Sequence, residues 1–80
     1  MNIKLENNFA IGNKYSVLGF KNSNLLLKKK LLDMGLIRGT IFEIVKVSPF
    51  GDRIAIFLRG YQLCINKENL NLMELFLIEE

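Results

Sequence analysis

The stretch LLDMGLIRGT, residues 31–40, marks the change from a helical to a strand pattern in this chain of 80 residues. Glycine readily adopts the left-handed conformation that ends many helices, and a hydrophobic residue commonly follows such a cap. The stretch therefore predicts that Gly35 caps a helix, with Leu36 behind it, and that Gly39 turns the chain into a strand. We expect the side chain of Arg38, between the two glycines, to reach solvent or the last carbonyl groups of the helix.

The segment before this joint, residues 25–34 (LLLKKKLLDM), has the pattern of a short amphipathic helix. Three apolar positions share the i, i+4, i+7 spacing of one helical face: Leu27, Leu31 and Met34. The lysines at 28–30 and Asp33 occupy the remaining arc. Leu26 falls among these charges, so we expect it to be exposed or to touch something outside the core. Ser23 is the expected N-cap.

Five further segments have the pattern of short β-strands: residues 14–20, 40–48, 53–59, 61–65 and 70–78. The residues expected to face the core are Tyr15, Val17, Gly19, Phe42, Ile44, Ile54, Ile56, Leu58, Leu63, Ile65, Met73, Leu75 and Leu77. Turn residues separate the segments, among them Gly35, Gly39, Pro49, Gly51 and Gly60. Residues 66–69 predict a turn or a single helical turn.

This arrangement of segments predicts a mainly β protein. Short strands with turn signals at intervals of about 8–12 residues are typical of small barrels and sandwiches. Apolar residues on both faces of segment 40–48 favour a small closed barrel. The expected fold is therefore a five-stranded β-barrel with one short helix inserted between its first and second strands. No repeat, linker or low-complexity block divides the chain, so we expect residues 1–80 to form one domain.

The composition narrows the possible functions. Eleven Lys and Arg against eight Asp and Glu give a formal net charge of +3, which permits an acidic partner or nucleic acid but indicates neither. There is no histidine, the commonest general base and transition-metal ligand. Cys64 is the single cysteine, so no intrachain disulfide can form, which fits a reducing compartment. Within its strand, we expect Cys64 to be a packing residue.

Targeting signals are not evident in the sequence. The N-terminal residues contain no apolar run like that of a signal peptide. Apolar stretches such as residues 75–78 are far shorter than the roughly 20 residues of a membrane-spanning helix. We therefore expect a soluble, cytoplasmic protein.

Several groups of residues, taken in order along the chain, resemble the FeoA family: residues 31–40, 42–47, 48–52, Ile54 with Ile56, and 59–61 with Leu63. Members of this family are small cytoplasmic SH3-like proteins that accompany FeoB, a bacterial ferrous-iron transporter with a cytoplasmic G domain. The resemblance covers residues 9–76. The chain departs from the family pattern at Arg53, where proline is common, and at Leu70, where alanine is usual.

The resemblance implies an SH3-like barrel that binds the cytoplasmic part of a FeoB-type transporter and modulates transport, without a small-molecule substrate. Its partner could recruit it to the inner face of the membrane. The association with iron transport also suggests transition-metal binding. The available ligands are one thiol and eight carboxylates, of which Glu68, Glu74, Glu79 and Glu80 would allow at most weak binding of Fe²⁺. We therefore expect no metal site and no cofactor, with iron as the cargo of the pathway.

Catalysis is not expected. Ser16, Ser23 and Ser48 have no base at a recognisable spacing, and Cys64 has no histidine partner. The glycines do not form either of the known nucleotide-binding loops. These absences, together with the missing histidines, predict a non-enzyme.

Protein binding is the function that fits the remaining residues, because SH3-like barrels commonly hold partners with exposed aromatics and turns. The candidate partner-binding residues are Phe50, Arg59, Tyr61, Leu26, Lys29 and Lys30. Phe50, on a turn, would be either a partner anchor or a lid over the barrel. The alternative function is a small basic barrel that binds single-stranded nucleic acid, although a solvated lysine face is the simpler interpretation of the lysines. A homo-oligomer formed through residues 76–78 is compatible with the first function.

Overall fold

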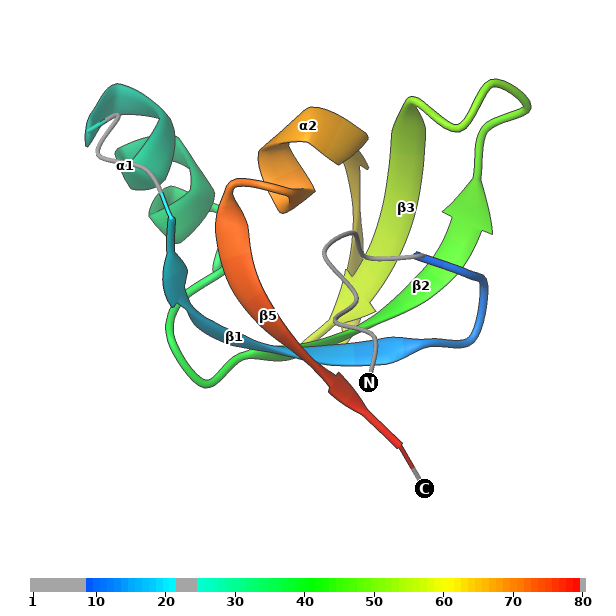
Figure 1. The fold of residues 1–80 in the computed structure, drawn as a ribbon, viewed down its shortest axis with the longest axis horizontal. Coiled ribbons are helices and arrows are strands. Elements are labelled where there is room, and N and C mark those ends of the chain that lie inside the picture. Colours follow the sequence, from blue (N-terminus) through cyan, green and yellow to red (C-terminus); the bar gives the residue numbers. More distant parts are fainter. Residues whose placement is uncertain (1–8, 22–24, 80) are drawn as a thin grey trace, which may run out of the picture.

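The computed structural model describes residues 9–21 and 25–79, which form five strands and two helices (Figure 1). In chain order these are β1 (Lys14–Phe20), α1 (Leu25–Asp33), β2 (Ile41–Val47), β3 (Arg53–Leu58), β4 (Tyr61–Asn66), α2 (Lys67–Leu70) and β5 (Met73–Ile78). The expected N-cap, Ser23, lies outside the described residues. No helix in the described part of the chain is long and apolar enough to cross a bilayer.

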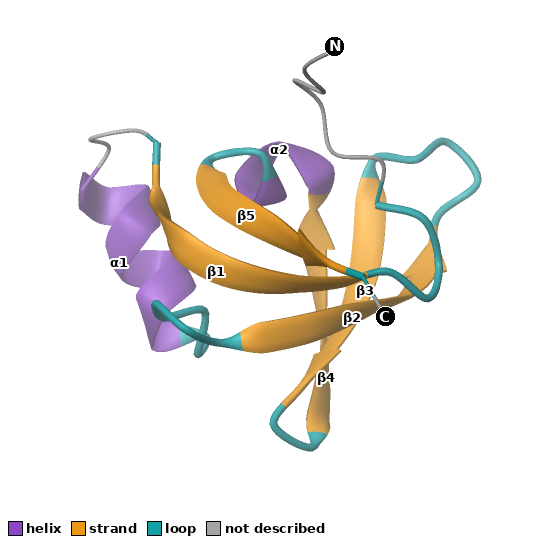
Figure 2. Ribbon diagram, turned by 60° about the horizontal axis from the view of Figure 1, so that its bottom comes forward, coloured by secondary structure: helices purple, strands orange, loops and turns teal. Residues whose placement is uncertain are grey.

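All five strands belong to one antiparallel sheet with the order β4-β3-β2-β1-β5. The sheet curls around its inner face, α1 stands at one end, and α2 joins β4 to β5 along the rim (Figures 1 and 2). The mainly β fold with a helix between β1 and β2 is thus confirmed. β4 and β5 are the edges of the sheet, so the barrel is open between them, whereas the sequence favoured a closed one.

The core lies on the inner face of the sheet, where alternate residues of each strand point. The inward positions predicted in β2 and β3 are almost fully buried: Phe42, Ile44, Ile54, Ile56 and Leu58. Leu31 of α1, Leu36 after it and Leu70 of α2 are also inaccessible to solvent, so both helices close the core. Full burial of such a side chain contributes about 1.5–3 kcal/mol.

A β-bulge in β1 reverses one predicted orientation. Val17 pairs with Leu75, but Gly19 pairs with Glu74, so the register shifts between Val17 and Gly19. A bulge places an extra residue on one strand and changes which face the following residues occupy. Gly19 therefore shares a face with the exposed Glu74 and does not face the core, as the alternation had predicted.

Two other predictions fail at the edges of the sheet. Cys64 in β4 is exposed rather than packed, and Leu77 in β5 is 39% exposed although its position predicted an inward side chain. Both strands have a neighbour on one side only. Side chains at a sheet edge lose part of the cover that a second neighbouring strand would provide. The position in the sheet, which the sequence pattern does not contain, explains both errors.

The joint between α1 and β2 is built as the sequence predicted. Gly35 and Gly39 both have positive φ angles, of +96° and +90°. The buried Thr40 donates its hydroxyl hydrogen to the Gly35 carbonyl oxygen at 3.0 Å. Arg38 is exposed, as expected, but its Nε donates to the Leu18 carbonyl oxygen of β1 at 3.1 Å rather than to the helix. This bond ties the joint to the neighbouring strand.

The two glycines of the joint should tolerate alanine differently. At Gly39 an added Cβ meets nothing within 4 Å, so Gly39→Ala should lower the free energy of unfolding by about 1 kcal/mol through its positive φ alone. At Gly35 the same Cβ would lie 2.5 Å from the Tyr61 hydroxyl oxygen. Gly35→Ala should therefore cost at least about 1 kcal/mol more in urea unfolding. Equal losses for the two variants would contradict this arrangement.

Candidate partner-binding surfaces

Phe50 lies at the tip of the β2–β3 loop, with 93% of its surface exposed to solvent. It therefore does not cover the barrel end, which was one of the two interpretations that the sequence allowed. The loop that carries it is a compact turn: the Gly51 amide donates to the Ser48 carbonyl oxygen, and Gly51 has a positive φ of +76°. An isolated exposed phenylalanine on a firm turn is a suitable anchor for a partner.

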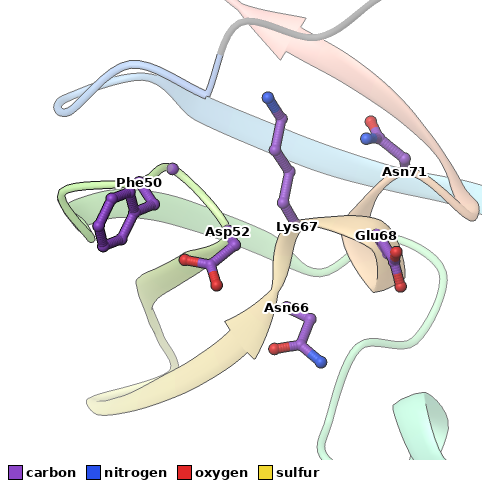
Figure 3. A pocket seen from close by; sticks show the side chains of 7 residues that line it. Phe50, Asp52, Asn66, Lys67, Glu68 and Asn71 are labelled. Carbon is purple, nitrogen blue, oxygen red and sulfur yellow. The ribbon is translucent and has the colours of Figure 1, made fainter.

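A pocket of about 480 Å³ lies beside this loop. Its lining residues come from the β2–β3 loop, the end of β4 and the α2 region: Phe50, Gly51, Asp52, Asn66, Lys67, Glu68 and Asn71. Figure 3 shows the Asp52 and Asn66 side chains directed to one side, and those of Lys67 and Asn71 directed to the other. We call this site the Phe50 pocket. Its walls combine one apolar ring with carboxylate, amide and ammonium groups.

Hydrogen bonds hold the two walls of the Phe50 pocket together. The Lys67 amide of α2 donates to the Asp52 carbonyl oxygen of the loop at 2.9 Å. Within the loop, the Ser48 hydroxyl donates to Asp52 Oδ1 at 2.8 Å and accepts from the Arg53 amide at 3.1 Å. A site fixed in this way loses little conformational entropy when a ligand enters.

The second surface is the outward side of α1, a helix that lies at the other end of the molecule from the β2–β3 loop (Figures 1 and 2). Leu25 and Leu26 are 74% and 84% exposed there. Lys29 forms an exposed ion pair with Asp33 at 3.3 Å, and Lys28 lies 5.6 Å above the centre of the Phe20 ring. We call this surface, comprising residues 25, 26 and 28–30, the α1 face. This surface therefore combines two exposed leucine side chains with three lysine ammonium groups.

Arg59 and Tyr61 serve the fold as well as the surface. Arg59 has a φ of +50° and Gly60 one of +88°, the pair of left-handed residues that a tight two-residue hairpin between β3 and β4 requires. The Arg59 Nη2 donates to the Thr40 hydroxyl oxygen at 3.2 Å. The Tyr61 hydroxyl donates to the Met34 carbonyl oxygen at 2.6 Å, so the hairpin holds the end of α1.

The structure thus divides the six predicted partner-binding residues into three groups. Leu26, Lys29 and Lys30 lie together on α1, Arg59 and Tyr61 brace the joint, and Phe50 lies apart from both groups. The sequence did not link Asn66, Lys67, Glu68 and Asn71 to Phe50, because they lie far from the 48–52 turn along the chain. Leu25, adjacent to Leu26 on α1, was also missed. A second leucine on the polar side of the helix could have indicated it.

The described residues contain no group of three or more His, Cys, Asp or Glu side chains placed to hold a metal ion. The carboxylates that the sequence suggested as weak ligands are dispersed: Glu68 is on α2 and Glu74 is on β5, while Glu80 lies outside the described residues.

Known protein families and solved structures include several that are similar to this chain. A model of the FeoA domain matches residues 7–74. The solution structure of a FeoA-like protein from Clostridium acetobutylicum has 34% sequence identity and a TM-score of 0.79, covering 88% of this chain and 80% of that one. Iron(II) transport protein A from Clostridium thermocellum has 28% identity and a TM-score of 0.77, covering 86% of this chain and 42% of that one.

A third structure supports the fold alone. FeoA from Stenotrophomonas maltophilia, complexed with zinc and described as a prokaryotic SH3 domain protein, has 11% identity and a TM-score of 0.69. The match covers 84% of this chain and 82% of that one. The expected SH3-like architecture is therefore confirmed.

The bond between Tyr61 and Met34 gives a test of how the joint is held. Tyr61→Phe keeps the ring but removes the hydroxyl, so it should lower the free energy of unfolding by about 1 kcal/mol. The same hydroxyl is the atom that an alanine side chain at position 35 would meet. Gly35→Ala should consequently cost less in the Tyr61→Phe background than in the wild type, in a double-mutant cycle read from urea unfolding. Strictly additive losses would show that the two groups do not meet.

Proposed function

Because the chain belongs to the FeoA family, we propose that it is a non-catalytic accessory protein of bacterial ferrous iron uptake that binds the cytoplasmic part of a FeoB-type transporter. Two structural relatives are themselves linked to ferrous iron transport. The Clostridium thermocellum protein is an iron(II) transport protein, and the Stenotrophomonas maltophilia protein has been put forward as an activating factor of ferrous iron transport. This chain carries no histidine, the commonest general base. We therefore expect it to act by binding a partner and not by catalysis.

The observation that carries the proposal is that Phe50 is exposed beside a pocket whose walls are held together by hydrogen bonds. Phe50 keeps 93% of its surface in water, although burying a phenylalanine is worth about 1.5–3 kcal/mol. The ring is also held on a turn whose own hydrogen bonds keep it out of the core. An aromatic residue that enters a partner's surface, with polar groups around it, is the usual centre of a protein interface.

The pocket beside Phe50 extends this contact. Asp52, Lys67 and Glu68 offer both signs of charge, and the amides of Asn66 and Asn71 can donate and accept. Such a lining suits a polar protein segment more than a hydrocarbon ligand. We propose that a loop of the transporter's cytoplasmic domain lies in the pocket and packs against the Phe50 ring.

The direct test is a calorimetric titration of the protein with the purified cytoplasmic domain of the FeoB-type transporter from the same genome. We expect saturable binding at a ratio of one to one. If neither the isolated domain nor the full transporter in detergent or nanodiscs bound the protein, the proposal would be wrong. Ferrous iron uptake into vesicles that contain the transporter, with and without the protein, would then show the direction of the effect.

Phe50→Ala should weaken binding to the transporter by at least about tenfold, the scale of a central aromatic anchor. Its thermal unfolding should match that of the wild type, because the ring has few contacts to lose. The control is Ile41→Thr, which alters an apolar residue that is 54% exposed on β2 and keeps a β-branched side chain. Similar affinities for the two variants would place the interface away from Phe50.

Iron should act as the cargo of the transporter and not as a ligand of this protein. Anaerobic titration with Fe²⁺ should therefore give no stoichiometric binding at micromolar concentrations, because the described carboxylates do not gather and histidine is absent. The experiment can be followed by calorimetry and by the shift of amide NMR signals. One tightly bound ion per chain would contradict this part of the proposal.

A further inference from the structure

The charges of this chain are concentrated around α1. Residues 21–38 contain five of the eleven basic residues but only one of the eight acidic residues, Asp33. The remainder of the chain has six basic and seven acidic residues, so it is close to neutral. The positive net charge of the protein therefore belongs to one end of the molecule, the end where α1 stands (Figure 1).

The same end carries the two leucines of the α1 face. Leu25 and Leu26 expose 74% and 84% of their surface. They begin the helix, and Lys28, Lys29 and Lys30, all three exposed, come after the partly buried Leu27. Adjacent leucines next to a group of lysines form the pattern of segments that bind membrane surfaces, where acyl chains take up the leucines and lysines meet anionic headgroups.

We propose that the α1 face binds the surface of a bilayer through the phosphate groups of anionic phospholipids, with Leu25 and Leu26 entering the interface between headgroups and acyl chains. The complementarity of charge supports a lipid surface as the occupant. The three lysines fan around the helix instead of converging on one point, since consecutive helical residues are about 100° apart. A bilayer presents many mobile phosphates and can satisfy such a spread, whereas an acidic protein partner would need carboxylates placed to match it.

The side of α1 opposite the α1 face packs against the core, and this limits how the helix can contact a bilayer. Leu31 is fully buried, and Leu27 and Met34 pack against the core. Because this side is packed against the core, α1 cannot insert fully into the membrane. The protein would contact the bilayer through the α1 face alone. The inference rests on the proposed function in one respect only: the transporter places the protein beside a membrane. Vesicles that contain no transporter test the lipid contact independently of that function.

The first experiment is co-sedimentation of the full-length protein with vesicles of phosphatidylcholine alone or with about 30% phosphatidylglycerol. We expect binding to the anionic vesicles at about 100 mM salt, little binding to the neutral ones, and a steep loss as salt rises. No binding to the anionic vesicles under these conditions would overturn the proposal.

Paired variants separate a local site from a general effect of charge. Lys29→Gln with Lys30→Gln should reduce the partition coefficient roughly fivefold per lysine. The control, Lys46→Gln with Lys67→Gln, removes the same charge from exposed residues of β2 and α2 and should change partitioning by less than about threefold. Equal losses would mean that only net charge matters and would refute the α1 face as the site.

A tryptophan reporter tests the entry of the leucines, because the chain has no tryptophan of its own. In Leu26→Trp, the fluorescence should shift to shorter wavelength when anionic vesicles are added. In Phe50→Trp, at the other end of the molecule, it should not. If the Leu26→Trp signal ignored vesicles but responded to the soluble cytoplasmic domain of the transporter, the α1 face would bind an acidic protein surface and the lipid proposal would fail.

Discussion

The hydrogen bond from the Tyr61 hydroxyl to the Met34 carbonyl oxygen fixes the end of α1 against the sheet. The helix has only nine residues and a single fully buried one, Leu31, so this bond adds to a small area of packing against the core. The close approach of Tyr61 requires the absence of a side chain at Gly35, and Thr40 then binds both the Gly35 carbonyl and Arg59. The direction in which α1 presents its outer face follows from this set of contacts.

Because the joint fixes α1 against the sheet, this short helix can keep two leucines exposed to solvent. A chain of 80 residues has a small core, and each apolar side chain left outside it loses stabilisation of which so small a protein has little. Leu25, Leu26 and Phe50 are nevertheless largely exposed, and each lies on a segment fixed by hydrogen bonds or by packing elsewhere. Their exposure is therefore a property of the folded state, which is consistent with use by a partner.

The sequence predicted the parts of this structure that depend on local pattern. The alternation of Phe42 and Ile44 in β2 placed them correctly in the core, and the glycine spacing at 35 and 39 identified the joint. Exposure at the edge of the sheet, as for Cys64, depends on which strands lie side by side, and a local pattern does not contain that information.

The candidate site was predictable to the same extent. Phe50 could be singled out because an aromatic residue in a Pro-Phe-Gly turn has no place in the alternation of a strand. The pocket beside it could not, because it exists only where the loop of Asp52 meets α2 through the Lys67 amide. Likewise, the lysines of α1 were visible in the sequence. The role of Tyr61 in holding that helix depends on a contact between residues that are 27 positions apart.

The separation of the two surfaces suggests how they would act together. α1 and the β2–β3 loop that carries Phe50 lie at opposite ends of the molecule in both views, so one could be occupied without blocking the other (Figures 1 and 2). Weak attraction of α1 to a bilayer would confine the protein near the transporter and raise the effective concentration of the pocket there. Because the pocket end is close to neutral in charge, it would remain free to face a protein while the basic end faces the lipid. A modest affinity at each end would then be sufficient for a stable complex at the membrane.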